Sequence, residues 1–229
     1  MENLLREYMD RVFSDRGYDS QPGQGPVVTI SREFGCPSKL IAQLLTKELN
    51  QYHNPANPQQ WKFINKEIVE AMARQLDLNP TEVNYMMSLG GYGLVEDVLA
   101  SFSQSYVSNH RIRKTITSVV RSIAGQGYVV IVGRGGSGIL QDFPNTIHIR
   151  LQATLEWRTK AICKSRNLSK AESSKLVVEM DNKRDAFVEM LTVGSFQPYF
   201  FNIALNCSSL SNEEIVGTIL GLMKIKKLI

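Results

Sequence analysis

Short runs of β-branched and apolar residues alternate with longer stretches of helical periodicity along this chain, and this alternation restricts the fold more than any other feature. Strands separated by helices run parallel, because the chain crosses back along one face of the sheet before the next strand begins. Strands are expected at residues 27–31, 61–65, 128–132, 146–152 and 199–206. Helices are expected at residues 38–50, 66–75, 79–125, 154–166 and 169–192, with a last helix from Ser211. The pattern predicts an α/β protein.

The carboxyl ends of parallel strands lie at one edge of the sheet, where proteins of this class bind their ligands. The loops after the predicted strands are therefore expected to share one rim. Four of these loops begin after Ile30, Ile64, Val132 and Leu151. Residues at these four points are the first places to look for binding groups.

Composition excludes several classes of protein. Of the 229 residues, 43% are hydrophobic and 21% charged, which is ordinary for a globular chain with a core. Cys36, Cys163 and Cys207 lie far apart without a CxxC pair, so reduced thiols are expected instead of disulfides or a zinc site. No stretch has the apolar length of a signal peptide core or a membrane span, so we expect a cytoplasmic protein with no membrane partner.

The segment SREFGCPSK, between the first strand and the first long helix, has features of a phosphate-binding loop. Gly35 permits unusual backbone angles, the helix begins near Ser38, and Lys39 places a cation in its first turn, where the helix dipole favours an anion. The full GxxxxGK[ST] pattern is absent: Glu33 and Ser38 stand where glycines belong, and Leu40 replaces the magnesium-binding hydroxyl. A plain strand–turn–helix with a surface lysine is the alternative interpretation.

Several segments, taken together and in order, resemble the cytidylate-kinase-like family of P-loop nucleotide kinases. They are VVTISREFG, FINKEIVEAMA, YVVIVGRGGSGIL, TIHIRLQATLEWR, EMDNKRDAF and IALNCSSLSNEEIVGTIL, which together span residues 27–222. Family members typically have Ser-Gly-Gly at positions 36–38, an aspartate at Asn65, and an acid at Gly135. The chain departs from the family pattern at these positions.

The resemblance implies a P-loop kinase-like three-layer fold, with a parallel five-stranded sheet flanked by helices, a helical acceptor subdomain and a lid. An N-terminal helix and linker would occupy residues 1–25, and the kinase-like domain residues 26–229. Within that domain, residues 79–125 would form the acceptor subdomain and residues 154–193 the lid. The implied activity is transfer of the γ-phosphoryl group from ATP, with Mg²⁺, to CMP or a similar small acceptor.

Candidate site residues follow from strand ends and from the family motifs. Phosphoryl transfer depends on cations that neutralise spreading negative charge, so arginine and lysine carry most of the assignments. The ATP phosphates are assigned to Arg32, Gly35, Cys36, Ser38 and Lys39, and the acceptor to Arg134 and Asn65. The lid residues are Arg158, Arg166, Asp181 and Arg184, where Asp181 is expected to orient Arg184 across one helical turn. Catalytic roles are assigned to Lys39, Arg158 and Arg184, and a weak contact to the Mg²⁺ of Mg-ATP to Ser31.

Other interpretations stay open at this stage. Arg134 could be an ordinary turn residue, and the charged helix pair at 154–192 could be a solvated face. A nucleotide sensor or interaction protein without catalysis would explain the altered loop. Nucleic acid is not an expected partner, because acids interrupt the basic residues and the net charge is only +4. The N-terminal helix could pack on its own domain or join a homodimer.

Overall fold

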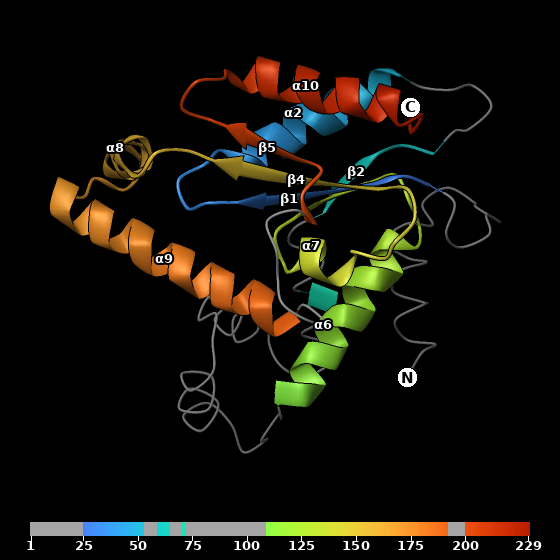
Figure 1. The fold of residues 1–229 in the computed structure, drawn as a ribbon, viewed down its shortest axis with the longest axis horizontal. Helices are drawn as coiled ribbons and strands as arrows, with labels where there is room; N and C mark the ends of the chain where they lie inside the picture. The colour runs from blue at the N-terminus through green and yellow to red at the C-terminus, as the bar shows by residue number, and fades with distance from the viewer. Residues whose placement is uncertain (1–24, 53–58, 65–69, 72–108, 192–199) are drawn as a thin grey trace.

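The computed structural model describes residues 25–52, 59–64, 70–71, 109–191 and 200–229 (Figure 1). The elements in chain order are β1 (Val27–Arg32), α2 (Ser38–Gln51), β2 (Lys62–Ile64), α6 (Asn109–Ala124), β3 (Val129–Val132), α7 (Gly136–Ile139), β4 (Thr146–Gln152), α8 (Leu155–Arg166), α9 (Lys170–Leu191), β5 (Ile203–Asn206) and α10 (Asn212–Ile225). The predicted N-terminal helix and most of the predicted acceptor subdomain lie outside the described residues.

Five parallel strands form one sheet in the order β2-β3-β1-β4-β5. β1 therefore lies between β3 and β4, and the chain winds outward from it in both directions. Ile30 is level with Val132 of β3 and with Ile149 of β4, so the three strands end at the same edge. The predicted parallel five-stranded sheet flanked by helices is confirmed, and the loops after β1, β3 and β4 share one rim as expected.

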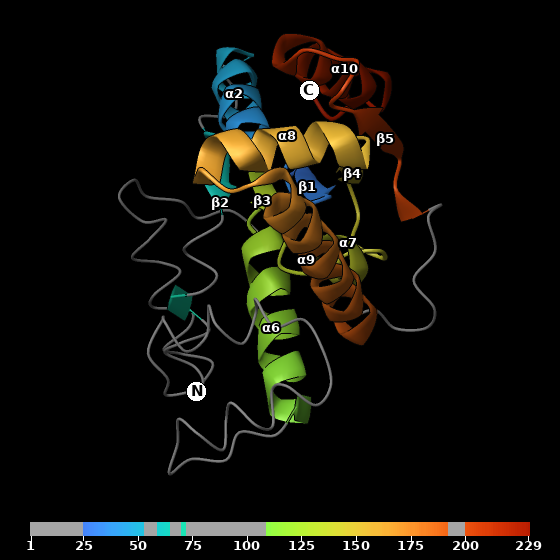
Figure 2. The ribbon, with the colours of Figure 1, turned by 90° about the vertical axis from the view of Figure 1, so that its left-hand side faces the viewer.

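Helices cover both faces of the sheet (Figures 1 and 2). Side chains alternate along β1, so Val28 and Ile30 belong to one buried cluster together with α2 and α10. On the opposite face, α7 lies close to the sheet, as a side chain at Gly136 would contact Ile131 of β3 and Thr29 of β1. Complete burial of each valine, leucine or isoleucine contributes about 1.5–3 kcal/mol, so the two apolar layers hold the rim in place.

Helices α9 and α10 each begin at a capping box that can be read from the sequence. The Ser211 side chain accepts from the N–H of Glu214, whose carboxylate accepts from the N–H of Ser211, so α10 begins with a complete capping box. Ser169 and Glu172 make the same reciprocal pair before α9. The predicted capping box at Ser169 is confirmed.

Two strands are shorter than predicted. Of the described part of the predicted last strand, residues 200–202 lie outside β5, which begins at Ile203: the side chain of Asn202 binds β4, where its Oδ1 accepts from the N–H of His148 at 2.7 Å. The second strand begins at Lys62, because the N–H of Trp61 donates to Asn50 Oδ1 of α2 at 2.7 Å. In both cases the side-chain oxygen of an asparagine accepts a hydrogen bond from a backbone N–H near the end of a strand.

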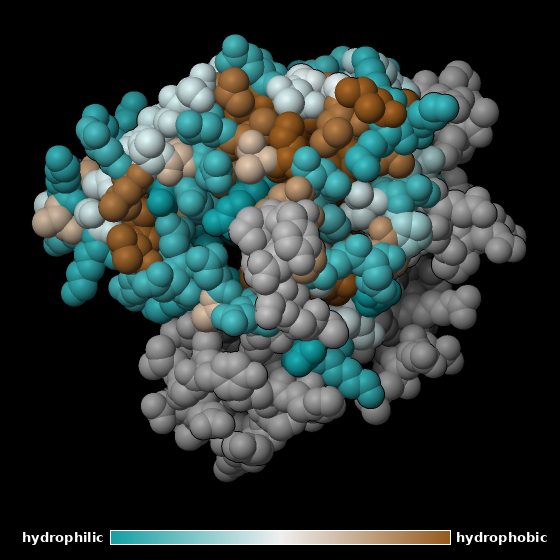
Figure 3. Space-filling model, viewed as in Figure 1, coloured by the Kyte–Doolittle hydropathy of each residue, from teal (hydrophilic) through white to brown (hydrophobic). Residues whose placement is uncertain are grey.

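The described surface is mostly hydrophilic, with apolar side chains gathered over α10 (Figure 3). Ile225, at the end of that helix, is 79% exposed. Among the described residues, no helix has both the length and the apolarity needed to cross a membrane.

One buried polar pair lies inside the sheet. Thr29 of β1 and His148 of β4 are level with each other, and Thr29 Oγ1 lies 2.7 Å from His148 Nδ1. Burial lowers the pKa of His148 from 6.5 to about 4, against an opposing hydrogen bond to the backbone of Leu140. The imidazole is therefore neutral in the folded protein at neutral pH.

This burial makes stability depend on pH. Between pH 6.5 and about 4 the unfolded chain protonates His148 while the folded protein does not, so stability falls as the pH falls. We expect the free energy of unfolding to drop by about 1.5 kcal/mol between pH 6.5 and about pH 5, measured by urea denaturation. In His148→Gln that part of the pH dependence should vanish. An identical slope in the variant would contradict the assignment to His148.

Candidate functional site

The loop between β1 and α2, residues 33–37, is held by its own backbone and by β4. The N–H of Glu33 donates to the carbonyl of Leu151 at 3.0 Å. The N–H of Cys36 donates to the carbonyl of Glu33 at 3.3 Å, and the N–H of Ser38 donates to that of Cys36 at 2.9 Å. These N–H groups are used within the protein, so they do not form an open ring around an anion.

Both polar backbone groups of Phe34 are bound by the helices that follow β4. Its N–H donates to Asp181 Oδ1 of α9 at 2.6 Å. Its carbonyl accepts from Arg158 Nη1 of α8 at 3.2 Å. Arg158 and Asp181 also form an ion pair and hydrogen bond with each other. One residue of the loop is thereby joined to both α8 and α9.

Arg158 uses the rest of its guanidinium in the same network. The residue is only 7% exposed. Its Nε donates to the carbonyl of Ala153 at 3.0 Å and lies 3.2 Å from Glu33 Oε2. Oε2 of Glu33 also accepts from the N–H of Ala153 at 2.9 Å. The guanidinium thus binds four protein partners and holds α8 to the β1–α2 loop, while the catalytic role assigned to Arg158 stays a prediction.

Asp181 does not have the partner that the sequence predicts. Its carboxylate binds Phe34 and Arg158 and not Arg184, the residue it was expected to orient. Burial lowers the pKa of the Arg184 guanidinium, and the charge of Asp181 opposes that shift. The buried Arg158 takes an oxygen atom of Asp181, and the expected orientation of Arg184 by Asp181 stays a prediction.

Gly35 allows close packing between the β1–α2 loop and α8. Its φ of +99° lies in the left-handed region, and a Cβ there would lie 3.0 Å from Arg158 Cβ and 3.2 Å from the Arg158 carbonyl oxygen. Glycine therefore lets α8 pack directly on the loop. The sequence analysis assigns Gly35 to the ATP phosphates, whereas in the structure helix α8 packs against this glycine.

Three arginines gather at the rim, and we call Arg32, Arg134 and Arg184 the arginine cluster. They come from the end of β1, the loop after β3, and α9. Burial, together with the charges of Arg184 and Arg134, lowers the pKa of Arg32 to about 9. Burial and the charge of Arg184 likewise lower the pKa of Arg134. The cluster concentrates positive charge where the fold places ligands.

The turn after β3 brings two of these side chains together. A Cβ at Gly133 would lie 1.9 Å from Arg32 Nη1, so the absence of a side chain makes room for the Arg32 guanidinium. Gly133, Arg134 and Gly135 have φ values of +68°, +57° and +69°. A left-handed arginine costs about 1 kcal/mol, and such strain is concentrated at functional sites.

Phe34 is a member of the site that the sequence analysis did not select. Its ring lies under two guanidinium groups, with Arg184 4.9 Å and Arg166 5.3 Å from the ring centroid. Arg184 Nη1 is buried and has no hydrogen-bond partner among the described residues. The signal that could have identified Phe34 is an aromatic residue two positions after the rim arginine Arg32.

The predicted lysine lies apart from this group. Lys39 is exposed, like Leu40 beside it, and it is not among the residues whose charges act on the arginine cluster. Ser38 is buried at the start of α2. Asn65, the second predicted acceptor contact, lies outside the described residues. The roles assigned to Lys39, Ser38 and Asn65 stay predictions.

The predicted metal contact has a protein partner. Ser31 Oγ lies 2.9 Å from Ser137 Oγ of α7. In the part of the chain that the structure describes, no group of three histidine, cysteine, aspartate or glutamate residues could hold a metal ion. Mg²⁺ binds few protein groups and keeps several waters when it accompanies nucleotide phosphates. The described residues therefore fit Mg²⁺ only as part of Mg-ATP.

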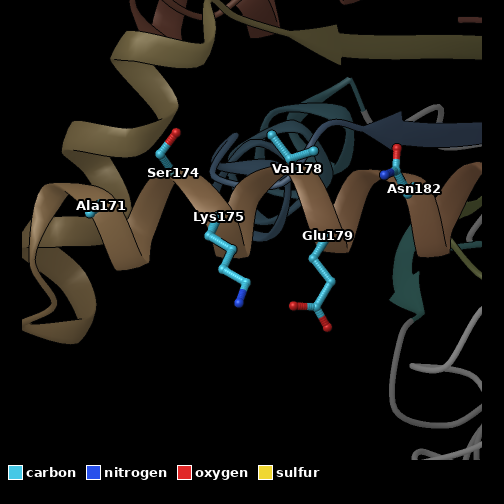
Figure 4. A pocket seen from close by; sticks show the side chains of 6 residues that line it. All are labelled: Ala171, Ser174, Lys175, Val178, Glu179 and Asn182. Carbon is cyan, nitrogen blue, oxygen red and sulfur yellow. The ribbon is translucent and has the colours of Figure 1, made fainter.

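A hollow on α9 is separate from the arginine cluster (Figure 4). It is lined by one face of that helix: Ala171, Ser174, Lys175, Val178, Glu179 and Asn182. Helical spacing puts Arg184 on the opposite face of α9. The hollow lies on a single helix surface and takes no part in the site.

Comparison with protein families gives one match. The model described as the cytidylate kinase-like family matches residues 27–209, which include the β1–α2 loop, the turn after β3 and both lid helices. The chain matches none of the curated proteins.

Solved structures share the fold at low sequence identity. An uncharacterized protein from Eubacterium ventriosum is 17% identical, with a TM-score of 0.59 over 88% of this chain and 99% of that chain. Shikimate kinase from Bacteroides thetaiotaomicron is 10% identical, with a TM-score of 0.49 over 88% and 98%. TT1252 from Thermus thermophilus is 14% identical, with a TM-score of 0.45 over 87% and 99%. The first of these supports the fold.

The contact between loop and lid can be tested by removing one charge. Asp181→Asn removes one of the two carboxylates that pair with Arg158 and leaves Glu33, so we expect the free energy of unfolding to fall by about 2 kcal/mol. The amide of Phe34 should also exchange with deuterium faster, because its acceptor is weakened. Urea denaturation and hydrogen exchange with mass spectrometry measure the two effects.

Glu179→Gln is the matched control on the same helix. Glu179 pairs with Lys183 at 2.6 Å but is half exposed, so its loss should leave the free energy of unfolding almost unchanged. Equal effects of the two substitutions, or an unchanged Phe34 amide in Asp181→Asn, would show that the loop does not depend on Asp181.

Proposed function

The chain belongs to the cytidylate kinase-like family, and we propose that it transfers the γ-phosphoryl group of Mg-ATP to a small phosphorylated acceptor, with CMP the first candidate. The observation that carries this proposal is the convergence of Arg32, Arg134 and Arg184 at the carboxyl ends of the strands. These cations come from three separate segments and act on one another. Positioning and charge neutralisation are the main requirements of phosphoryl transfer.

A phosphorylated ligand would relieve the electrostatic cost of the cluster. Each arginine is more easily deprotonated than usual because burial and the neighbouring guanidinium groups disfavour its charge. A phosphate that carries two negative charges offsets that repulsion, and its oxygens match the planar fork of a guanidinium. The buried Nη1 of Arg184 has a donor to offer to such a ligand.

We assign roles from the origin of each arginine. Arg134, on the strained turn after β3, holds the acceptor phosphate. Arg184, on lid helix α9, stabilises the phosphoryl group in transfer, and Arg32 at the end of β1 is close enough for the charges of both to act on it. Mg²⁺ enters with ATP and supplies charge neutralisation on its phosphates. Arg158 and Asp181 position the lid helices over the loop.

A second function has its own support. A nucleotide sensor without catalysis is favoured by the β1–α2 loop, where Asp181 takes the Phe34 N–H and Leu40 replaces the magnesium-binding hydroxyl. Such a protein would bind a nucleotide at the arginine cluster without converting it to a product. Both functions predict that a nucleotide binds, but only the kinase predicts that a phosphorylated product forms.

A turnover assay with variants tests the first function. ADP formation is followed with Mg-ATP and a panel of nucleoside monophosphates and other small acceptors, and we expect production that depends on one acceptor. Arg134→Lys keeps the charge but loses the bidentate fork, so we expect kcat/KM to fall by about 10–100-fold, a loss of roughly 1.4–2.7 kcal/mol in transition-state stabilisation.

Lys160→Gln is the control, since it removes a cation from exposed lid helix α8 without touching the cluster. Its kcat/KM should stay within about twofold of the wild type, in keeping with the small energies of exposed pairs. Thermal stabilisation by ATP without any acceptor-dependent ADP would support the sensor instead. Neither stabilisation nor product, with any nucleotide, would refute both.

A further inference from the structure

Two of the three cysteines lie together at the rim. Cys36 is in the β1–α2 loop and Cys207 directly follows β5, so they are far apart in the sequence. Cys207 belongs to the buried apolar cluster, Cys36 packs against that cluster, and each thiol shifts the pKa of the other. Cys163, on α8, is not part of this pair.

Backbone contacts explain why the two residues meet. The N–H of Cys207 donates to the carbonyl of Gln152 at 2.8 Å, and the N–H of Glu33 donates to that of Leu151 at 3.0 Å. The loop and the end of β5 are thus both attached to neighbouring residues at the end of β4. The approach of Cys36 to Cys207 is set by the sheet and by the course of the loop.

The two thiols differ in environment. Cys36 is half-buried, while Cys207 is 6% exposed. The neighbouring Cys207 and burial raise the pKa of Cys36, whereas the neighbouring Cys36 lowers the pKa of Cys207. Cys207 is therefore the thiol that more readily loses its proton.

We propose that Cys36 and Cys207 form a redox-sensitive pair, which hydrogen peroxide converts to a disulfide that ties the β1–α2 loop to the end of β5. The deprotonated sulfur of Cys207 attacks one peroxide oxygen, the O–O bond breaks, and the hydroxide released takes up a proton to become water. The sulfur of Cys36 gives up its proton and attacks the resulting sulfenic sulfur, so that an S–S bond forms and a second water leaves. Two thiols lose two electrons and two protons, and peroxide is reduced to water.

The disulfide would act on the candidate phosphate site, a consequence that rests on the proposed function. The loop now uses its N–H groups internally, so any binding of phosphate by the loop needs it to rearrange. A covalent bond at Cys36 opposes that rearrangement. Cys36 also lies near the arginine cluster, since a negative charge on its sulfur would raise the pKa of both Arg32 and Arg184.

Peptide mapping tests the chemistry without any nucleotide. The reduced, full-length protein is treated with hydrogen peroxide, blocked with iodoacetamide and digested. We expect a cross-linked peptide that contains Cys36 and Cys207 and that dithiothreitol separates. Cys163→Ser should retain the cross-link, and Cys36→Ser should lose it. Oxidation of Cys163 in the wild type without this cross-link would overturn the proposal, and the pair would then be ordinary apolar packing.

Two further measurements test the effect on the loop. Amide hydrogen exchange at residues 33–38 should slow in the oxidised wild type, and dithiothreitol should reverse the change. ATP should bind about tenfold more weakly to the oxidised form, a difference of about 1.4 kcal/mol. Unchanged exchange in the cross-linked protein would overturn the regulatory part. If neither form binds nucleotide, the proposed function fails, while mapping and exchange still decide the redox pair.

Discussion

The guanidinium of Arg158 is the contact on which the arrangement of this site depends. It binds the carbonyls of Phe34 and Ala153 and the carboxylates of Glu33 and Asp181, so it joins the β1–α2 loop, the end of β4 and both lid helices. A nearly buried cation is stable only when its partners are complete. The β1–α2 loop and helices α8 and α9 are therefore coupled. If one of them moves, the charged and polar groups of the others need new hydrogen-bond partners.

This coupling changes how the chain could hold an anion. A glycine-rich loop binds phosphate through its own N–H groups, whereas here Cys-Pro-Ser occupies the turn and proline has no N–H to offer. The Phe34 N–H already binds a carboxylate. Recognition of charge would then rest on side chains, above all on the arginine cluster, with Phe34 supporting Arg184 from below. Side chains provide less rigid coordination than a backbone ring, which fits a family member whose loop has lost its glycines.

The sequence was sufficient for the parallel sheet and the helix starts, through periodicity, and for the rim positions of Arg32 and Arg134, through the strand ends; Arg184, within a helix, was assigned from the family resemblance. It was insufficient for the ion pairs. Asp181 is one turn from Arg184 and was assigned to it, but burial of Arg158 decides the partner, and burial depends on packing between distant segments. For the same reason the closeness of Cys36 to Cys207, and the position of Phe34 beneath two arginines, could not be read from spacing. Lys39 matched a motif by position alone, and the helix presents it to solvent.

The lengths of the outer strands have a consequence for behaviour in solution. β2 and β5, the two edges of the sheet, have three and four residues. An exposed strand edge is a template on which another chain can extend the sheet, and short edges give that template little length. The sheet should thus resist the growth of intermolecular β-structure at high concentration, even though its central strands are among the most apolar segments of the chain.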